Sequence, residues 1–454
     1  GEASRHGIID MADHRSLGGA SARSRKFQST VRRETFAPDE TKTLRRFSTW
    51  EVTDLILKVN PKTFNKKIRE EANMPDGLVE AGLNGMRWFD LREINQIRTQ
   101  WRDRGRAKLL PQRPEGKRAI RVACANFKGG AGKSTTALHF AHAAALDGYK
   151  VLVVDFDPQA TISHAMGIVD VPEEKTVWGI IAQDLIIETK RMNLERQLDD
   201  PRARLIALPA GIEGAVSEGD GHDAFIARTC WPTIDAIGSC ANAAFVEFAT
   251  AEYRMTNRGW SFFAAVDRFL NTLPRERYDL ILFDCPPAIG YQSLNAVYAA
   301  DILYIPTGPG YWEYDSTTSF MGQLSEALGE IGAAYAEDPA VGATLPKRFE
   351  AVRVVLTRYE HANELHRSMR NALHRVFGDW VTEHPIEHTR AVDQGGRFQR
   401  SVYEMDYRTM TRETWKRARR SFDAAYAELK QTILEAWPNL AEIPVAREVE
   451  ENAA

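Results

Sequence analysis

One stretch of the chain, residues 119–157, holds an apolar run, a glycine-rich loop, an alanine-rich segment and a second apolar run, in that order. The first run is AIRVACANF, the alanine-rich segment is STTALHFAHAAALDGY, and the second run is KVLVVDFD. Short apolar runs are typical of buried strands, and Gly148 is a typical end for the helix between them. Strand, loop, helix and strand in this order begin an open parallel sheet. The sequence therefore predicts an α/β fold with an open, mostly parallel sheet.

Three further apolar runs extend this pattern toward the C-terminus. They are YDLILFDCPP at 278–287, ADILYIPTG at 300–308 and FEAVRVVLTRY at 349–359. Strands and helices alternate to about residue 390, and long helical patterns follow. Residues 218–260 show poor periodicity, so we interpret them as an insertion with helices of uncertain limits. We therefore expect the main domain over residues 120–425 and a C-terminal helix and tail over residues 426–454.

The glycine-rich loop departs from the usual phosphate-binding pattern, in which a glycine and four further residues precede Gly-Lys-Ser/Thr. Phe127 stands where the first glycine is expected, and an additional lysine, Lys128, follows it. The glycines still let backbone amides wrap a phosphate, and the following helix directs its N-terminal amides at the same anion. We expect Lys133 to reach the β- and γ-phosphates and the Ser134 hydroxyl to bind Mg²⁺. The expected phosphate ligands are Gly129, Gly130, Ala131, Gly132, Lys133, Ser134 and Thr135.

Three aspartates follow two of the predicted strands, as VVDFDPQ and LILFDCPP. Ligands of open α/β sheets bind outside the carboxyl ends of the strands, so Asp155, Asp157 and Asp284 are expected to gather near the glycine loop. Asp284 suits a water-mediated contact to Mg²⁺, Asp155 would support that ion indirectly, and Asp157 would orient or activate the attacking water. A single aspartate at a strand end is more often a cap or turn residue. Three of them beside a glycine loop favour a nucleotide site over a chance glycine-rich turn.

The N-terminal part of the chain divides into three segments. Residues 1–43 are rich in Ser, Arg and Gly and lack periodicity, so we expect disorder there. Residues 44–109 carry the pattern of a small helical domain. Residues 110–119 contain proline and arginine and are interpreted as a linker.

The small domain contains the pattern of a winged helix-turn-helix. Ser48 and Glu51 form a capping box at the start of one helix, and Pro61 begins a second helix after a short turn. A glycine-containing stretch, PDGLVEAGLNGMRWFD, suits a wing, and a third helix follows it. A basic face on a small bundle or a dimerisation domain is the alternative to DNA binding. The candidate DNA contacts are Lys62, Thr63, Asn65, Lys66 and Arg87, because residues at the start of a recognition helix meet base edges and a wing residue reaches the backbone or minor groove.

Composition restricts the remaining classes of function. The net charge of −3 over 454 residues neither favours nor excludes nucleic acid, because a local basic face can be hidden in it. The four cysteines lack CxxC spacing, so we expect reduced thiols and no zinc site. No apolar run approaches the length of about 20 residues that a membrane helix needs, and the first residues lack the apolar core of a signal peptide. We therefore expect a cytoplasmic protein; the sequence does not begin with Met, so its first residue need not be the native start.

Four stretches resemble the ParA-type partition ATPases, a family in the larger group that also contains MinD and nitrogenase iron protein. They are NFKGGAGKSTTALHFA, GYKVLVVDFDPQATIS, YDLILFDCPP and LTRYEHANELHRSMRNALHRVFGD. The resemblance runs from about residue 44 to 425, includes the helix-turn-helix, and is strongest to the RepA ATPases of repABC plasmids. The glycine loop together with DFDPQA is very specific to this family, and Ala131 occupies a position that varies in it.

The resemblance implies an enzyme that hydrolyses ATP to ADP and phosphate, uses Mg²⁺, and forms a homodimer with ATP bound. In this family the early lysine contacts phosphates held by the partner subunit, so the expected catalytic residues are Lys128, acting across the dimer, Lys133 and Asp157. The physical argument agrees, because a lysine is a flexible point charge that can neutralise a neighbour's γ-phosphate. Phosphate binding by Lys128 within its own subunit is the alternative.

The resemblance also implies DNA and protein partners. It implies non-specific DNA binding by the ATP form, operator-specific binding with repression of its own operon, and a ParB- or RepB-like centromere-binding protein that helps segregate a plasmid or chromosome. The expected location is the cytoplasm, in association with the nucleoid and without a membrane. The candidate contacts for non-specific DNA are Arg390, Arg397, Arg400, Arg408 and Arg412; the commoner role of such arginines is solvated surface or internal ion pairs.

Three other functions compete with partition. A MinD-like membrane ATPase needs a basic amphipathic C-terminal helix, but the end of this chain is acidic and interrupted by proline. An iron–sulfur reductase needs cysteines that bridge a cluster, and Cys285 is expected in the core. A transcriptional repressor that uses nucleotide only as a ligand is supported by the helix-turn-helix.

Overall fold

The computed structural model describes residues 14–36, 41–79, 85–102, 109–210, 212, 221–242, 246–397 and 399–440. The chain divides into two compact units, Gly1–Thr43 and Leu44–Ala454. The first unit holds α1 (His14–Phe36), so the predicted disorder is wrong for these residues. The stretch contains no proline, and a solvated helix needs no periodic apolar face, which is the signal on which the prediction relied.

The small domain at the start of the second unit combines helices with a three-stranded antiparallel sheet of order β1-β3-β2. Its elements are β1 (Phe47–Ser48), a π-helical turn η1 (Glu51–Ile56), α2 (Pro61–Glu70), β2 (Leu78–Val79), β3 (Arg87–Phe89) and α3 (Leu91–Arg102). This order is compatible with the predicted helix, turn, helix and wing, and the winged helix-turn-helix stays a prediction. The loop of the wing, residues 80–84, lies outside the described residues.

The predicted helix starts of this domain have the expected hydrogen bonds. The Ser48 amide donates to the Glu51 carboxylate at 3.0 Å, and the Glu51 amide donates to the Ser48 hydroxyl at 3.4 Å, which is a capping box. Pro61 begins α2, and the Asn60 side chain accepts from the next two amides. Phe64 then packs edge-on against two rings from β3 and α3, so the apolar face of α2 is buried in the domain.

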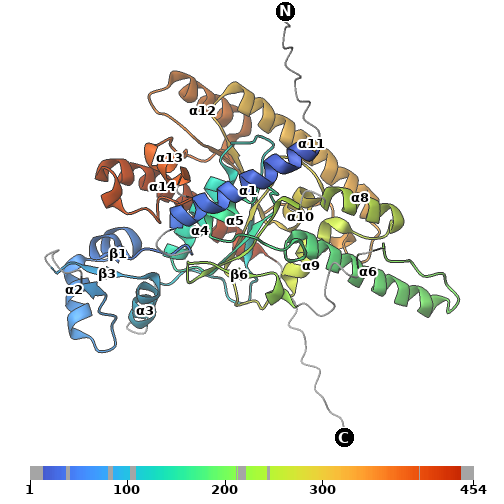
Figure 1. Cartoon of the computed structure of the whole chain (residues 1–454), viewed down its shortest axis with the longest axis horizontal. Helices are drawn as coiled ribbons and strands as arrows, with labels where there is room; N and C mark the ends of the chain where they lie inside the picture. Colours follow the sequence, from blue (N-terminus) through green and yellow to red (C-terminus); the bar gives the residue numbers. More distant parts are fainter. Residues whose placement is uncertain are drawn as a thin grey trace, which may run out of the picture. The chain divides into compact units, whose positions relative to one another are not determined.

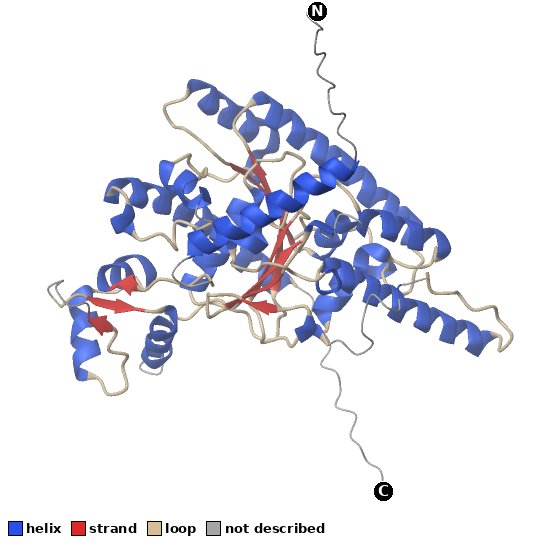
Figure 2. Ribbon diagram, viewed as in Figure 1, coloured by secondary structure: helices blue, strands red, loops and turns tan. Residues whose placement is uncertain are grey.

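The main domain is built on a seven-stranded sheet of order β10-β9-β4-β8-β5-β7-β6. The strands are β4 (Ile120–Cys124), β5 (Val151–Asp155), β6 (Ala227–Arg228), β7 (Ile234–Ile237), β8 (Leu280–Asp284), β9 (Ile302–Thr307) and β10 (Ala351–Leu356). All neighbours are parallel except β6 and β7, which confirms the predicted open, mostly parallel sheet. Figure 2 shows this sheet between two layers of helices.

Two apolar cores form because side chains alternate between the two faces of each buried strand. One core joins the sheet to α4 (Lys133–Leu146), α5 (Thr161–Ala165), α13 (Arg390–Arg397) and α14 (Arg412–Ala436). The other joins it to α6 (Val177–Asp199), α8 (Val246–Thr256), α9 (Ala265–Asn271), α10 (Tyr291–Ala299), α11 (Tyr311–Tyr335) and α12 (Glu364–Phe377). Figure 1 shows α4, α13 and α14 on one side of the sheet and α6, α9 and α10 on the other.

Short 3₁₀ turns connect these elements. They are η3 (Glu173–Lys175), η4 (His222–Ala224), η6 (Phe262–Ala264), η7 (Gly342–Thr344), η8 (Gly378–Trp380), η9 (Tyr407–Thr409) and η10 (Trp437–Asn439). Within the described ranges, no helix has the length and hydropathy of a membrane span. The C-terminal tail, residues 441–454, lies outside those ranges.

Two features of the domain differ from the expected organisation. The stretch interpreted as a helical insertion, residues 218–260, contains the strands β6 and β7, and β7 pairs with β5 in the main sheet. These strands are too short to show a period in the sequence. The expected boundary between residues 425 and 426 falls inside α14, which packs as one helix on α4.

The small domain is attached to the main domain through arginine and aromatic side chains. The Arg412 guanidinium lies 4.3 Å from the centre of the Trp50 ring, and the Arg408 guanidinium lies 4.5 Å from that of Trp88. Trp50 also meets Tyr407 edge-on at 5.5 Å. On the other side of the junction, the buried Arg98 of α3 donates to the Leu146 carbonyl at the end of α4.

His139 holds α4 against the C-terminal part of the domain. Its ring stacks on Phe422 with centroids 3.7 Å apart. Its Nε2 accepts from the Val402 amide at 3.2 Å, so its Nδ1, 2.7 Å from the Thr135 carbonyl, carries the proton. Burial lowers the pKa of His139 to about 4. The folded protein therefore keeps this imidazole neutral.

The neutral His139 predicts a loss of stability in acid. The pKa of His139 in the folded chain is below its usual value of 6.5. Between these two pKa values only the unfolded chain takes up the proton. The free energy of unfolding is therefore unaffected above pH 6.5 and falls as the pH falls toward 4. Between pH 7 and pH 5 the loss is about 2 kcal/mol. Urea unfolding of wild type and His139→Gln at both pH values measures it. We expect the variant to lose most of this difference and His374→Gln, a control on α12, to keep it; equal acid sensitivity in His139→Gln would contradict the assignment.

Candidate functional site

The glycine loop joins the end of β4 to the start of α4 at the carboxyl edge of the sheet. Gly130 and Gly132 have positive φ angles of 77° and 84°, which side chains disfavour, and Gly132 is the N-cap of α4. A Cβ atom at Gly129 or Gly130 would meet no atom of the described residues within 4 Å. The space beside these two glycines is therefore free of side chains, as a phosphate cradle requires.

Lys133 extends back across this loop. It is 6% exposed, and its Nζ donates to the Lys128 carbonyl at 2.9 Å. Burial lowers the pKa of Lys133, and the nearby Asp284 carboxylate opposes that effect. The ammonium is thus held in the loop beside the strand-end carboxylates.

Two further side chains fix the loop, and the sequence motifs did not indicate either of them. The buried Asn126 amide donates to the Pro306 carbonyl and to the Thr317 hydroxyl, each at 2.9 Å. The Thr357 hydroxyl, just after β10, donates to the Ala131 carbonyl at 2.9 Å. The loop is therefore tied to the ends of β9 and β10. In the sequence, Asn126 and Thr357 are marked only by their positions, since Asn126 precedes the loop and Thr357 follows a predicted strand.

Asp155 and Asp284 end neighbouring strands and lie opposite each other in register. Asp155 accepts from the Asp157 amide at 2.9 Å, from the Ser163 amide at 3.2 Å and from the Ser163 hydroxyl at 2.5 Å. Burial raises the pKa of Asp155 to about 7. The oxygens of Asp155 are occupied by the protein, so this residue holds the turn over residues 157–163.

Asp284 is fully buried, and neither of its carboxylate oxygens has a hydrogen-bond partner among the described residues. Burial raises its pKa well above the usual value and the Asp155 carboxylate adds to the rise, while the Ser134 hydroxyl and Lys133 oppose it. Unpaired buried oxygens are costly unless a cation or its water occupies the site. Asp284 and the neighbouring Ser134 therefore fit Mg²⁺, which binds through one or two protein ligands plus water and substrate phosphates. The described residues contain no cluster of three or more metal-binding side chains that would hold an ion alone.

Asp157 and Lys128 remain available for chemistry at the same edge. Asp157 is 8% exposed, and one of its oxygens accepts from the Gln159 amide at 2.9 Å. Lys128 is half-buried, and its ammonium makes no hydrogen bond or ion pair within the described residues. The structure therefore brings all the predicted nucleotide residues to one edge of the sheet.

The predicted DNA contacts of the small domain share an exposed face of α2. Lys62, Asn65 and Lys66 are exposed, and Thr63 is half-buried. Lys66 makes only a loose ion pair with Glu70 at 3.8 Å. Arg87 lies on β3 and donates to the Asp76 carbonyl, so it is partly engaged in the domain.

The five candidate arginines of the C-terminal part separate into two groups. Arg390 and Arg397 are exposed on α13, Arg400 is half-buried, and none of the three has an ion pair in the described part of the chain. Arg408 and Arg412 instead attach the small domain, and Arg408 also pairs with Asp406 at 2.6 Å. The first group has no such contact, while the second group is exposed but engaged with the small domain, and the DNA role of both groups stays a prediction.

A cleft of about 290 Å³ lies beside α4, the helix that follows the glycine loop. Ser134 and Thr135 line it from α4, Gln159 and His164 line it from the turn and helix after Asp157, and Arg400 lines the far wall. The candidate DNA residue Arg400 thus borders the same cleft as the hydroxyls of Ser134 and Thr135, which are predicted to bind phosphate.

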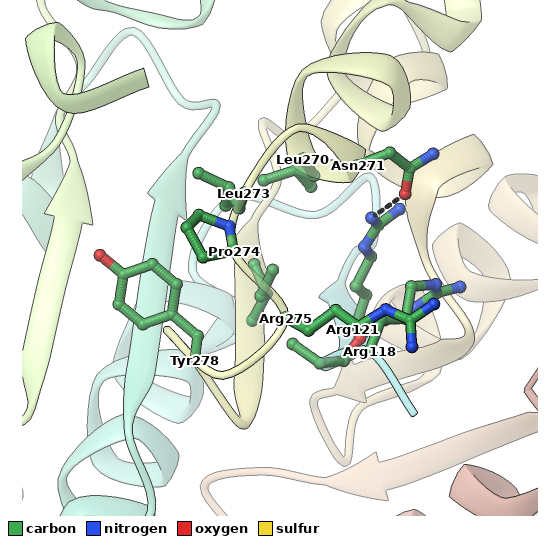
Figure 3. Close-up of a pocket in the computed structure, with 10 residues that line it drawn as sticks. Arg118, Arg121, Leu270, Asn271, Leu273, Pro274, Arg275 and Tyr278 are labelled. Atoms are coloured by element: carbon green, nitrogen blue, oxygen red, sulfur yellow. Dashed lines mark hydrogen bonds between the residues drawn. The ribbon is translucent and has the colours of Figure 1, made fainter. Parts of the chain in front are cut away.

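A second hollow, shown in Figure 3, lies at the opposite edge of the sheet, near the amino ends of β4 and β8. Its volume is about 20 Å³, which is room for about one water. Arg118 pairs with Asp301 at 2.7 Å, and Arg121 pairs with Asp267 and donates to Asn271. The arginines of this hollow are engaged in ion pairs and hydrogen bonds within the fold, and the hollow lies away from the nucleotide residues.

Comparison with known proteins agrees with this geometry. The model of the CobQ/CobB/MinD/ParA nucleotide binding domain matches residues 122–397. A putative replication protein A of Sinorhizobium fredii is 28% identical over 411 residues, which cover 88% of this chain and 89% of the relative. SopA of Escherichia coli is 25% identical over 84% of this chain and 87% of its own length, and the chromosome partitioning protein ParA of Caulobacter vibrioides is 24% identical over 63% and 86%.

A solved structure described as a partition protein has the same fold. Its TM-score is 0.58 at 16% identity, over 93% of this chain and 99% of the solved one. The family match covers more than half of the chain and contains the glycine loop and all three strand-end aspartates. The chain therefore belongs to the CobQ/CobB/MinD/ParA family of nucleotide-binding proteins.

Proposed function

We propose that this protein is a DNA-partitioning ATPase. It hydrolyses ATP in a nucleotide-sandwich dimer, binds DNA without sequence preference in the ATP state, and segregates a plasmid or chromosome with a ParB- or RepB-like partner. The observation that carries the proposal is the open glycine loop with Lys133 beside Asp284, a buried carboxylate whose two oxygens have no partner in the described part of the chain. Relatives named for replication and partition support the same role.

The loop residues perform the binding step. The amides of residues 129–135 and the N-terminus of α4 hold the phosphates, and the Lys133 ammonium neutralises charge between the β- and γ-phosphates. Ser134 and Asp284 would hold Mg²⁺, which would supply further neutralisation of the phosphate oxygens. Asp157 orients the attacking water toward the γ-phosphate, and ADP and phosphate are released.

Lys128 acts on the partner subunit's nucleotide. Its side chain has no partner within the described residues, while its carbonyl holds Lys133, so the backbone at this position serves the subunit's own site and the side chain is free to serve another. A cation that reaches the γ-phosphate of a second subunit makes the dimer stable with ATP and weaker after hydrolysis.

Two substitutions separate nucleotide binding from turnover. Lys133→Ala removes the buried ammonium and should abolish ATP binding. Asp157→Ala should retain ATP binding and the ATP-dependent dimer but reduce turnover by about 100-fold or more, because water is no longer oriented. Equilibrium binding of a fluorescent ATP analogue and phosphate release in the presence of DNA measure the two effects. Normal turnover by Asp157→Ala would remove that residue from its role.

A third substitution tests the action of Lys128 across the dimer. Lys128→Ala should leave the affinity of the monomer for ATP within about threefold of wild type, because its ammonium is outside its own phosphate cradle. ATP-dependent dimers should disappear in light scattering, whereas Lys190→Ala on α6 should dimerise as wild type does. A loss of ATP affinity in monomeric Lys128→Ala would favour the alternative role within one subunit.

Two DNA activities are expected on different surfaces. Arg390, Arg397 and Arg400 would bind phosphates of any DNA in the ATP dimer, and α2 would enter a major groove of an inverted repeat near the protein's own promoter. The second activity would make the protein a repressor of its own operon. A repressor that uses nucleotide only as a ligand is the second candidate function, and it is favoured by the exposed polar face of α2. A MinD-like positioning ATPase has no comparable feature in its support.

A crossed pair of variants separates the two DNA activities. Replacing Arg390, Arg397 and Arg400 by Ala should reduce the salt dependence of non-specific binding by about 0.9 in log–log slope for each DNA phosphate that is no longer neutralised. Replacing Lys62 and Asn65 by Ala should remove protection of a discrete operator in footprinting and leave that slope unchanged. Operator protection by a chain that lacks residues 1–104 would contradict the role of the small domain, and an unchanged slope in the arginine variant would contradict that of α13.

A further inference from the structure

The loop that follows Asp284 is fastened at its far end by a residue outside the nucleotide motifs. Residues 285–290 join β8 to α10, and Gly290, the N-cap of α10, has no side chain with which to accept from the first amides of the helix. Those amides donate to Glu247 of α8, Tyr291 to Oε2 at 2.7 Å and Gln292 to Oε1 at 3.0 Å. Glu247 therefore caps a helix to which it does not belong.

The fit between the two helices is close. A Cβ atom at Gly290 would lie 2.5 Å from Glu247 Oε2, so the carboxylate needs a glycine there. A carboxylate at a helix N-terminus is stabilised by two charge-assisted hydrogen bonds and by the helix dipole. The Phe262 ring packs edge-on against Tyr291 at 4.9 Å, and the Arg254 guanidinium of α8 covers Phe262 at 4.9 Å. The start of α10 is thus held by α8 and by the segment that follows it.

The Asp284 carboxylate oxygens accept no hydrogen bond from the described residues, whereas its main-chain carbonyl accepts from the Phe156 amide at 2.9 Å. The direction of the carboxylate therefore follows the backbone on either side of it. On one side that backbone is β8, which pairs with β4 and β5. On the other side the Cys285 amide donates to the Cys124 carbonyl at 3.2 Å, and the rest of the loop runs to the first turn of α10.

We propose that Glu247 is a positioning residue for the ATPase reaction, and the inference rests on the proposed function. By capping α10 it fixes the loop after Asp284, and through that loop it sets the Asp284 carboxylate against Mg²⁺ and the γ-phosphate. The stretch 218–260, for which no sequence motif indicates a role, thereby contributes to turnover through α8. Phosphate binding by the glycine loop and Lys133 does not pass through α8, so the cap acts on turnover and not on the affinity for ATP.

The experiment combines hydrogen exchange without nucleotide and steady-state kinetics with MgATP and DNA. In Glu247→Ala, the amides of Tyr291 and Gln292 should exchange roughly tenfold faster, since a hydrogen bond to a charged acceptor contributes that much. Its kcat should fall roughly tenfold through misplacement of the magnesium carboxylate, with KM for ATP unchanged. Glu247→Gln keeps one acceptor oxygen and should give intermediate values of both. Glu252→Ala, on the exposed side of the same helix, should match wild type in exchange and kcat.

The outcomes separate the cap from the proposed function. Unchanged exchange in Glu247→Ala, or equal effects in Glu252→Ala, would overturn the cap whatever the turnover. A raised KM with an unchanged kcat would overturn its action through Asp284. If wild type exchanges as expected but hydrolyses no ATP with DNA present, the ATPase assignment fails and the positioning role fails with it, while the exchange result still decides whether the cap exists.

Discussion

The site depends on two carboxylates that the fold places side by side in a buried position. Asp155 and Asp284 end adjacent parallel strands in register, and both are almost fully removed from water. Burial raises the pKa of each; the Asp157 carboxylate adds to the rise at Asp155, and the Asp155 carboxylate adds to the rise at Asp284. The protein compensates Asp155 with three internal hydrogen bonds, whereas the described residues donate none to Asp284. This asymmetry gives Asp155 a structural role and leaves Asp284 without an internal donor, which is why we propose Asp284 for Mg²⁺.

The same edge explains why the glycine loop can be open and yet fixed in place. Within the loop, the Lys133 ammonium bonds to the Lys128 carbonyl, and the space at Gly129 and Gly130 stays free of side chains. From outside, Asn126 and Thr357 tie the loop to β9 and β10. The cost of ordering a flexible segment is therefore met by the folded sheet before any phosphate binds, which is what preorganisation means in energetic terms.

The sequence predicted what depends on local pattern and missed what depends on distant contact. The five principal strands and the capping box of Ser48 and Glu51 follow from patterns within about a dozen positions, and the structure agrees. The phosphate residues follow from the same kind of local pattern and stay a prediction. Asn126 and Glu247 have partners more than forty positions away, and no local pattern marks such a pair. Helix α1 was missed for a different reason, because a helix without a packed face has no period to detect. The arginines at 408 and 412 are exposed and also contact aromatic rings of the small domain, a contact that their charge alone did not predict.

One helix connects the two functional regions of the second unit. The first turn of α4 supplies Ser134 and the phosphate-directed amides, and its last carbonyl, that of Leu146, accepts from Arg98 of the small domain. Between these ends His139 binds the backbone at Val402, in the segment that continues to the arginines that hold Trp50 and Trp88. Nearly every residue of α4 is buried, so the helix moves as a rigid body or not at all. A change at the phosphate end that displaces α4 therefore also displaces the surface on which the small domain rests. The contacts of α4 with Arg98 and with the segment after Val402 are therefore sufficient to transmit a nucleotide-dependent displacement to the small domain that carries α2.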